Sequence, residues 1–380
     1  MSAALQAQAR LLKDWLIDAA LPFWALHGVD SNGGFYEDLH LDRSPNVNAI
    51  RRVRVQSRQI FVYAEATRLG WFDGTNVADN TYAFLEQYGY QQDGKHNITA
   101  GYAHRIGPDY GVVDSSRDFY DHAFHLLGAA TLSALPDAQY SEAARVRCGD
   151  ILGFVDVELE ADNAGWLEGK PAVLPRRQNP HMHYLEASMA LYRVTKDPRH
   201  LGSAHQVYRL FEQYFFDPKN AVISEFFNQD WSLLDGELGQ SAEPGHAVEW
   251  VWLLGQYEAL TGLYSGTQAR ALYDKAFIGN PVFLNDEEDK LGNPRRATKR
   301  LWVQTEVIRA HLAMMQRGET SAAANAVRAI EAFREHYLND DGTWVDQLDS
   351  EGRPCAATIP VSTFYHILGM VTEAVKVAKA

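Results

Sequence analysis

Apolar residues recur at helical spacing in one segment after another, and this pattern constrains the fold more than any other feature of the sequence. Residues 11–24, 57–71 and 118–135 show it, and so do later segments as far as residues 363–379. A recurrence every three to four residues places the apolar side chains on one face of an α-helix. The sequence therefore predicts a mostly helical protein of the all-α class.

Short β-prone pieces rich in glycine and aromatic residues separate these helical segments. Each follows a predicted helix, and several share a glycine next to an aromatic residue, as in GGF, GW and GTW. The pieces are residues 32–39, 164–168, 222–233 and 341–349. Such a repeat predicts helical hairpins that bury their apolar faces against one another, about six of them in a closed ring. The ring would gather the beginnings of its inner helices around one pocket; the alternative is an irregular helical bundle.

Length, charge and cysteine content limit the domain organisation and the partners. No stretch of the 380 residues resembles a linker, so we expect one compact domain over residues 1–380. The formal net charge of -14 argues against a nucleic-acid partner. Charges throughout residues 1–24 predict neither a signal peptide nor a membrane span, and only Cys148 and Cys355 occur. We therefore expect a cytoplasmic protein, in which the glycosylation-type sequence at residues 97–99 has no consequence.

Two predicted helices carry a histidine and a glutamate three positions apart close to their beginnings. In EPGHAVEWVW, residues 243–252, these are His246 and Glu249, directly after a proline and a glycine that suit the start of a helix. The second pair, His183 and Glu186, follows Pro180. Residues three apart share a helix face, so each pair points one way. The simplest interpretation of one such pair is a core histidine bonded to a neighbouring acid, and the repetition favours a functional role.

Zinc is an alternative interpretation of the histidines near residue 180. The ligands would be His181 and His183, but their spacing differs from the His-Glu-x-x-His pattern that places two imidazoles one turn apart. A helix aims these two rings in different directions. The sequence therefore favours chemistry without a metal.

Further polar residues stand close to the beginnings of other predicted helices. His366 follows Ser362 and Thr363, which can cap a helix. The others are Gln56 and Arg58, His122 and His125, and Trp302, Gln304 and Glu306. Each alone is more often a satisfied core group, and it is their shared position that indicates a site.

The combination of tryptophan, histidine, glutamate and arginine suits a sugar. Tryptophan stacks on the flat C–H face of a pyranose, and histidine can move protons at a carbon next to a carbonyl near neutral pH. Arg58 could stabilise the developing oxyanion. Glycoside hydrolysis is the alternative, but it requires two carboxylic acids across one bond, whereas histidines dominate here. The pattern favours proton transfer.

Five ordered motifs resemble the N-acylglucosamine 2-epimerase family, which includes mannose isomerases, other aldose-ketose isomerases and cellobiose 2-epimerases. The resemblance extends from Gly28 to His366. The motifs are GVDSNGGFYEDLHLD, FYDHAFHLL, QNPHMHYLEASMALY, EPGHAVEWVWLL and RLWVQTEVIRA.

The resemblance implies a fold and a set of site residues. Members of the family form an (α/α)6 barrel, here with short β-hairpins in the connecting loops, as a single catalytic domain that is a monomer or a homodimer. The two catalytic histidines of the family fall on His246 and His366. Its sugar-binding positions fall on Arg58, His183, Glu186, Glu249 and Trp302, with His122 lining the same cavity.

The approach to the last histidine, IPVSTFYH, resembles the mannose isomerase branch. We therefore expect interconversion of D-mannose and D-fructose through a cis-enediol, with no metal and no organic cofactor. His366 would move the carbon-bound proton, and His246, held by Glu249, would open the pyranose ring. The alternatives are a 2-epimerase of mannose or of cellobiose-type sugars, a sugar-binding barrel without catalysis, and a glycoside hydrolase.

Overall fold

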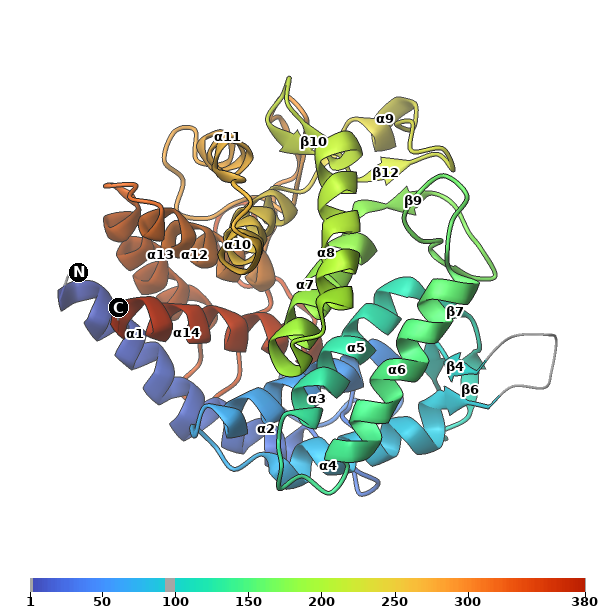
Figure 1. The fold of residues 1–380 in the computed structure, drawn as a ribbon. Helices are drawn as coiled ribbons and strands as arrows, with labels where there is room; N and C mark the ends of the chain where they lie inside the picture. The colour runs from blue at the N-terminus through green and yellow to red at the C-terminus, as the bar shows by residue number, and fades with distance from the viewer. Residues whose placement is uncertain (1–2, 93–99, 380) are drawn as a thin grey trace.

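A computed structural model describes residues 3–92 and 100–379, so the glycosylation-type sequence at residues 97–99 lies outside the described part. In this part, six helices form an inner ring in which each contacts the next and the last returns to the first (Figure 1). They are α3 (Val53–Arg68), α5 (Phe119–Ser133), α7 (Gln178–Thr195), α10 (Pro244–Thr261), α12 (Leu301–Gln316) and α14 (Phe364–Lys379).

The outer helices each pack against one inner helix. Helix α4 packs on α3, α6 on α5, α8 on α7, α11 on α10 and α13 on α12, while α1 packs on α14 and brings the two chain ends together (Figure 1). Their bounds are α1 (Ala3–Trp15), η1 (Leu16–Ala20), α2 (Leu21–His27), α4 (Thr75–Phe84), η2 (Leu85–Gly89), α6 (Ser141–Glu158), α8 (Pro198–Leu210), η3 (Phe211–Phe215), α11 (Gly266–Ala276) and α13 (Ala322–Tyr337). The predicted (α/α)6 barrel is confirmed.

Burial explains which helices lie inside. Every residue of α10 from Pro244 to Leu254 is buried, whereas α1 buries only Leu5, Ala9 and Leu12 along one stripe. A helix that is apolar on all sides needs neighbours all round, and an amphipathic helix needs them on one side. No helix in the described residues is both long and apolar enough to cross a membrane.

Short antiparallel strands occupy the loops and lead into the inner helices. Strand β2 runs directly into α3, β7 into α5, β9 into α7 and β16 into α12. The two-stranded sheets are β1 (Asp38–His40) with β18 (Thr358–Pro360), β3 (Tyr90–Gln91) with β4 (Gly101–Tyr102), β7 (Arg117–Asp118) with β8 (Gly169–Lys170), β9 (Arg176–Arg177) with β12 (Phe226–Phe227), β10 (Phe216–Asp217) with β11 (Val222–Ile223), and β16 (Lys299–Arg300) with β17 (Gln347–Leu348). Two sheets have three strands, in the order β2 (Arg51–Arg52), β5 (Arg105–Ile106), β6 (Val112–Asp114) and in the order β13 (Ser241–Ala242), β14 (Glu287–Asp289), β15 (Pro294–Arg296). Two short helical turns, α9 (Gly236–Gly239) and η4 (Val361–Thr363), complete the chain.

A seven-residue loop recurs where the sequence predicts β-prone pieces. Its first and last residues form an isolated bridge, as in Val29 with Phe35 and Leu338 with Trp344. The fifth residue has a positive φ, which glycine adopts without strain: φ is 86° at both Gly33 and Gly342. The closing aromatic residue is buried in both loops. The glycine and aromatic pattern therefore marks turns that bury an aromatic side chain in the core of the barrel.

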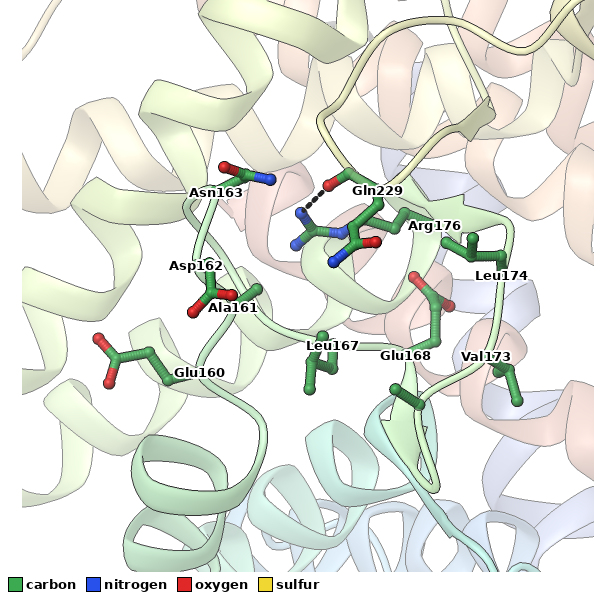
Figure 2. Close-up of a pocket in the computed structure, with 11 residues that line it drawn as sticks. Glu160, Ala161, Asp162, Asn163, Leu167, Glu168, Val173, Leu174, Arg176 and Gln229 are labelled. Carbon is green, nitrogen blue, oxygen red and sulfur yellow. Dashed lines mark hydrogen bonds between the residues drawn. The ribbon is translucent and has the colours of Figure 1, made fainter.

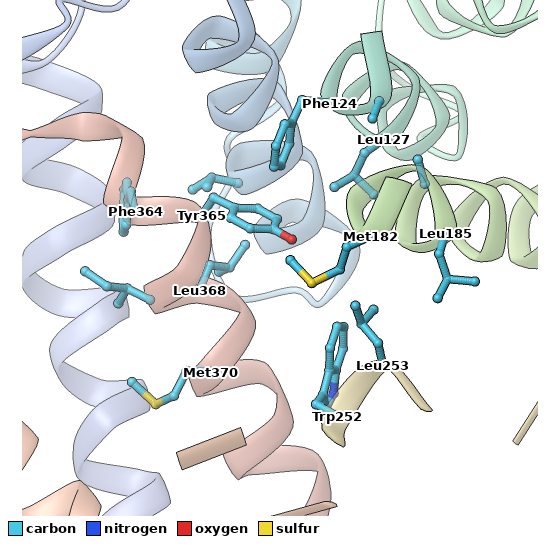
Figure 3. Close-up of a cluster of buried hydrophobic side chains, with 14 of the residues drawn as sticks. Phe124, Leu127, Met182, Leu185, Trp252, Leu253, Phe364, Tyr365, Leu368 and Met370 are labelled. Carbon is cyan, nitrogen blue, oxygen red and sulfur yellow. The ribbon is translucent and has the colours of Figure 1, made fainter. Parts of the chain in front are cut away.

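The side chain of the fourth residue of several inner helices forms hydrogen bonds with the backbone of a loop that precedes the helix. The side-chain amide of Gln56 in α3 accepts a hydrogen bond from the backbone N–H of Phe35 (2.7 Å) and donates one to its carbonyl (2.9 Å). Gln304 in α12 bonds Leu284 in the same way. In α5 the residue two positions further along, Phe124, faces the barrel core instead, where its ring centroid lies 5.2 Å from that of Tyr365 (Figure 3).

Candidate active site

The sixth residue of several inner helices contributes a side chain to the site. Counting from the first residue of each helix, and from Val361 for the last, this position is buried in the described structure. The residues are Arg58, Phe124, His183, Glu249, Glu306 and His366. Because the inner helices run in the same direction from one rim, equivalent positions come together at one depth of the barrel.

A cavity of about 360 Å³ opens at this end of the barrel. Six of the eight residues predicted for the site line it: Arg58, His183, His246, Glu249, Trp302 and His366. Residues from the surrounding loops and helix starts complete the lining, among them Arg52, Tyr120, Asn179, Glu243, Arg300 and Asp346. The cavity is therefore polar and carries both signs of charge.

The two predicted catalytic histidines line the cavity, and both lie next to Trp302. The centroid of the Trp302 ring lies 5.3 Å from that of His246 and 5.4 Å from that of His366. Both imidazoles bond a carboxylate through Nδ1, and Nε2 of neither ring has a hydrogen-bond partner among the described residues. Each histidine thus presents one free nitrogen for chemistry.

The carboxylate that holds His246 differs from the predicted one. Nδ1 of His246 lies 3.1 and 3.0 Å from the two oxygens of Glu225, which stands between β11 and β12. Glu249, the residue predicted to hold it, has neither carboxylate oxygen hydrogen-bonded within the described structure, and its side chain is buried. The prediction that His246 is held by Glu249 is therefore wrong: position six of α10 aims Glu249 at the cavity instead.

His366 is held by Glu306 of the neighbouring helix α12. Nδ1 of His366 lies 3.0 Å from Oε1 of Glu306. One turn further along α12, Nη1 of Arg309 donates to both oxygens of Glu306 at 3.0 and 2.9 Å. The orientation of His366 thus depends on a chain of two buried residues.

The surroundings push the pKa values of the two histidines in opposite directions. Burial disfavours the charged ring of His246, but the negative charges of Glu225, Glu243 and Glu249 outweigh burial and raise its pKa to about 10. Burial lowers the pKa of His366 well below 6.5, and Arg58 lowers it further. These shifts favour the protonated ring at His246 and the neutral ring at His366.

Glu249 has a raised pKa because it is buried and lies near other carboxylates. Burial is the larger cause, and Glu306 and Glu186 add to it, while Arg309 and His246 oppose it. A carboxyl group that faces the cavity, makes no internal hydrogen bond and holds its proton easily can exchange that proton with a bound molecule.

The predicted substrate-binding residues on α3 and α7 are fixed by their neighbours. Arg58 donates to the Ser362 carbonyl (3.1 Å) and to the Tyr120 hydroxyl (2.9 Å), and its guanidinium lies 4.1 Å from the centroid of Phe124. No carboxylate pairs with Arg58 among the described residues, so its positive charge is available to the cavity.

Glu186 lies behind His183 and does not line the cavity. Its Oε2 atom is 3.3 Å from Nδ1 of His183, and the hydroxyl of Tyr365 donates to the same oxygen. The predicted pairing of His183 and Glu186 along one helix face is confirmed. Its place in the structure gives Glu186 the task of orienting His183.

Comparison with known proteins places the chain in one family. Residues 34–370 match the N-acylglucosamine 2-epimerase (GlcNAc 2-epimerase) family. The chain belongs to the N-acylglucosamine 2-epimerase family. It is 31% identical over 394 residues to a mannose-6-phosphate isomerase of Rhizobium meliloti (strain 1021), with 98% of each chain covered.

Two solved structures have the same barrel fold as this protein. A cellobiose 2-epimerase from Spirochaeta thermophila DSM 6192 superposes with a TM-score of 0.87 at 21% identity, covering 99% of this chain and 97% of that one. A D-mannose isomerase superposes with a TM-score of 0.85 at 20% identity, with 99% of each chain covered. At these identities the two comparisons show the fold.

His122 does not lie in the cavity of this family member, which corrects the prediction. Its Nδ1 atom donates to the Asp118 carbonyl (2.7 Å) and Nε2 accepts from the backbone N–H of Tyr102 (3.3 Å). His181 uses the same two contacts, to Arg177 and Trp166, so it has no nitrogen left for zinc. Both are fourth residues of inner helices, the position that fastens loops.

Two groups of side chains in the described residues bring carboxylate and imidazole atoms within 4.8 Å of one another. They are His104, Asp118 and Asp121, and Glu249, Glu306 and His366. In each group an arginine already bonds a carboxylate: Arg54 donates to Asp121 (2.8 Å), and Arg309 donates to Glu306. A guanidinium neutralises the charge that would attract a metal, so both donor sets suit internal ion pairs.

A second cavity, of about 470 Å³, lies among the loops around β9 (Figure 2). Its two buried charged side chains are Glu168 and Arg176. Glu168 accepts from the backbone and side chain of Arg177, while Arg176 donates to the carbonyls of Ala164, Trp166 and Gln229. Because these groups bond the protein itself, this cavity lacks the free acid and base of the barrel cavity.

Three buried residues of the site were not assigned roles from the sequence. Glu225 lies 21 residues before His246, in a loop that no helical period reaches. Glu306 occupies the same sixth position as His183, so alignment of the helix starts could have found it. Arg309 follows Glu306 by one turn, which is a spacing typical of an ion pair on any helix.

Proposed function

We propose that this protein interconverts D-mannose and D-fructose through a cis-enediol intermediate. The observation that carries the proposal is the pair of imidazoles that share one cavity with opposite tendencies to bind a proton. The surroundings raise the pKa of His246, which favours its protonated ring, and lower the pKa of His366, which favours its neutral ring. Two groups whose pKa values are pushed apart supply an acid and a base at the same pH. The names of the relatives, mannose-6-phosphate isomerase and D-mannose isomerase, support the same reaction.

Ring opening is the task that suits His246. Its Nε2–H can donate to the ring oxygen as the bond from that oxygen to C1 breaks, and the neutral ring can then accept the proton that O1 loses. Glu225 on Nδ1 stabilises the imidazolium before transfer. Trp302, which lines the cavity next to both histidines, offers a flat face on which the sugar ring can stack.

Transfer of the carbon-bound proton is the task that suits His366. Its neutral Nε2 can remove the proton from C2, and it can return that proton to C1 on the same face of a planar cis-enediol. Arg58 can stabilise the negative charge on oxygen that forms in between. Glu249, which lines the cavity and has a raised pKa, can carry the proton that moves between O2 and O1.

The reaction is tested by incubating the purified protein with D-mannose in heavy water after treatment with a chelator. Chromatography should show D-fructose, and NMR should show deuterium entering the product. The His366→Ala variant is the matched control and should form no fructose. Sugar binding without turnover would contradict the proposal and favour a binding barrel.

A 2-epimerase is the second candidate, because two imidazoles face the same cavity. If His246 lies on the opposite face of the enediol from His366, it can return a proton to C2 with inverted configuration. The likeness to a cellobiose 2-epimerase accords with this. Mannose would then give glucose in preference to fructose, and cellobiose would be the second substrate to test.

A further inference from the structure

Arg309 is buried close to the residues of the catalytic cavity but does not line the cavity itself. Its side chain is 2% exposed, and Nη1 donates to both oxygens of Glu306. The guanidinium lies 3.3 Å from the ring centroid of Trp252, the tryptophan that points into the core from α10 (Figure 3). Helix α14 also comes close, because a Cβ atom on Gly369 would lie 3.6 Å from Cζ of Arg309. The guanidinium is therefore held by three helices.

Three buried carboxylates surround this single cation. Glu306 bonds it directly, Oε1 of Glu186 is 4.0 Å from its Nη2, and Glu249 lies near enough for its charge to be felt. The other charged and titratable groups that face the cluster are His183 from α7, His246 from α10, Tyr365 and His366 from α14, and Arg58 from α3. Burial favours the uncharged form of each carboxylate and raises the pKa of Glu306, and the charge and hydrogen bond of Arg309 are the largest effects that oppose this rise.

The bond from Glu306 to His366 fixes which nitrogen of the imidazole faces the cavity. An ionised Glu306 accepts a hydrogen bond from Nδ1–H, which leaves the lone pair on Nε2 for the substrate. A protonated Glu306 would donate to Nδ1 instead, and the proton would then sit on Nε2, where the ring could no longer act as a base. The two-pronged bond from Arg309 occupies both oxygens of Glu306 and favours the first arrangement.

We propose that Arg309 is a positioning residue for the isomerisation, which keeps Glu306 ionised so that His366 presents a basic Nε2 to the sugar. This inference rests on the proposed function, because it takes His366 as the carbon base. Arg309 acts only through Glu306 and His366, so its loss should change catalysis far more than binding of the sugar.

The test compares Arg309→Met and Arg309→Lys with the wild type, using D-mannose as substrate. Loss of the guanidinium should lower kcat by about 10²-fold, the scale of a misplaced catalytic group, while KM changes less than about threefold. The acidic limb of the kcat profile should move to higher pH, because Glu306 then ionises later. Lysine restores the charge without the two-pronged bond, so it should recover part of kcat.

Arg176→Met is the matched control. Arg176 is likewise 2% exposed and stacks on a tryptophan, Trp231, at 3.6 Å, but it belongs to the second cavity. The Arg176→Met variant should lower the stability of the protein without moving the pH profile of kcat. Equal changes in kcat and in the pH limb for both variants would overturn the proposal, since loss of any buried arginine would then explain them.

Two further measurements keep the test decisive. The ¹⁵N NMR signals of the His366 imidazole, assigned with His366→Ala, should show a proton on Nδ1 in the wild type and on Nε2 in Arg309→Met, without any need for turnover. If Arg309→Met fails to fold, the Glu306→Gln/Arg309→Met double variant removes both charges and should be as active as Glu306→Gln alone. An unchanged His366 signal, or a double variant much less active than Glu306→Gln, would refute the role of Arg309. A wild type that is inactive on mannose refutes the proposed function alone, because the NMR result stands by itself.

Discussion

Replacement of Glu225 by glutamine should destabilise the protein by an amount that depends on pH. The pKa of His246 rises from 6.5 to about 10 in the folded state. At about 1.4 kcal/mol per unit this corresponds to roughly 5 kcal/mol of preference for the protonated ring. Glu225 is the largest attractive cause, so Glu225→Gln should lose about 3 kcal/mol of unfolding free energy at pH 6, within the range for breaking a buried pair.

The sign of the pH dependence follows from the raised pKa. A group that binds its proton more tightly when folded stabilises fully below its unfolded pKa, here 6.5, and loses that contribution as the pH rises through about 10. The difference between wild type and Glu225→Gln should therefore shrink from pH 6 to pH 10. Glutamine keeps an oxygen that can accept from Nδ1–H, so little difference should remain at pH 10.

Urea unfolding followed by tryptophan fluorescence at pH 6, 8 and 10 measures this difference. The control is Glu258→Gln on α10, the helix that carries His246. The carboxylate of Glu258 accepts a hydrogen bond from Arg317 at 2.8 Å. The pKa of Glu258 is lowered and arginine does not titrate in this range, so the control difference should be constant. A loss in Glu225→Gln that is equal at pH 6 and pH 10, or larger at pH 10, would refute the assignment of a charged His246.

Three further predictions concern catalysis and the loop anchors. His366→Ala should lower kcat at least about 10²-fold and abolish deuterium exchange at C2, with an unchanged circular dichroism spectrum; exchange at the wild-type rate would contradict its role as the carbon base. Chelator treatment should leave the rate of fructose formation unchanged, and a loss restored by one added metal would show that a metal takes part. His122→Ala leaves the Asp118 carbonyl and the Tyr102 N–H without their partner, so it should lower the unfolding free energy by about 2–3 kcal/mol. A large rise in KM with no loss of stability would instead indicate that His122 binds the substrate.

The helices and their closure into a ring could be predicted because both follow from local patterns. A period of 3.6 residues is written within each helix, and glycine suits the positive φ at the fifth position of a loop, as at Gly33 and Gly342. The direction in which a polar residue points along a buried helix is harder to predict. His122 and His183 both stand near the start of an apolar helix, yet the first is a fourth residue and the second a sixth residue. Only the ring of neighbours decides which of these faces the axis.

The partner of each proposed catalytic histidine shows the limit of local reasoning. Glu249 is the nearest acid to His246 along the helix, and spacing alone selects it, but Glu225 reaches the ring from a loop. The two histidines then have the same immediate environment, a carboxylate on Nδ1. Their pKa values diverge because the charge of Glu225, with those of Glu243 and Glu249, outweighs burial at His246, whereas at His366 burial is reinforced by the positive charges of Arg58 and Arg309. Acid and base are therefore assigned by the assembled barrel, through charges from helices far apart in the sequence.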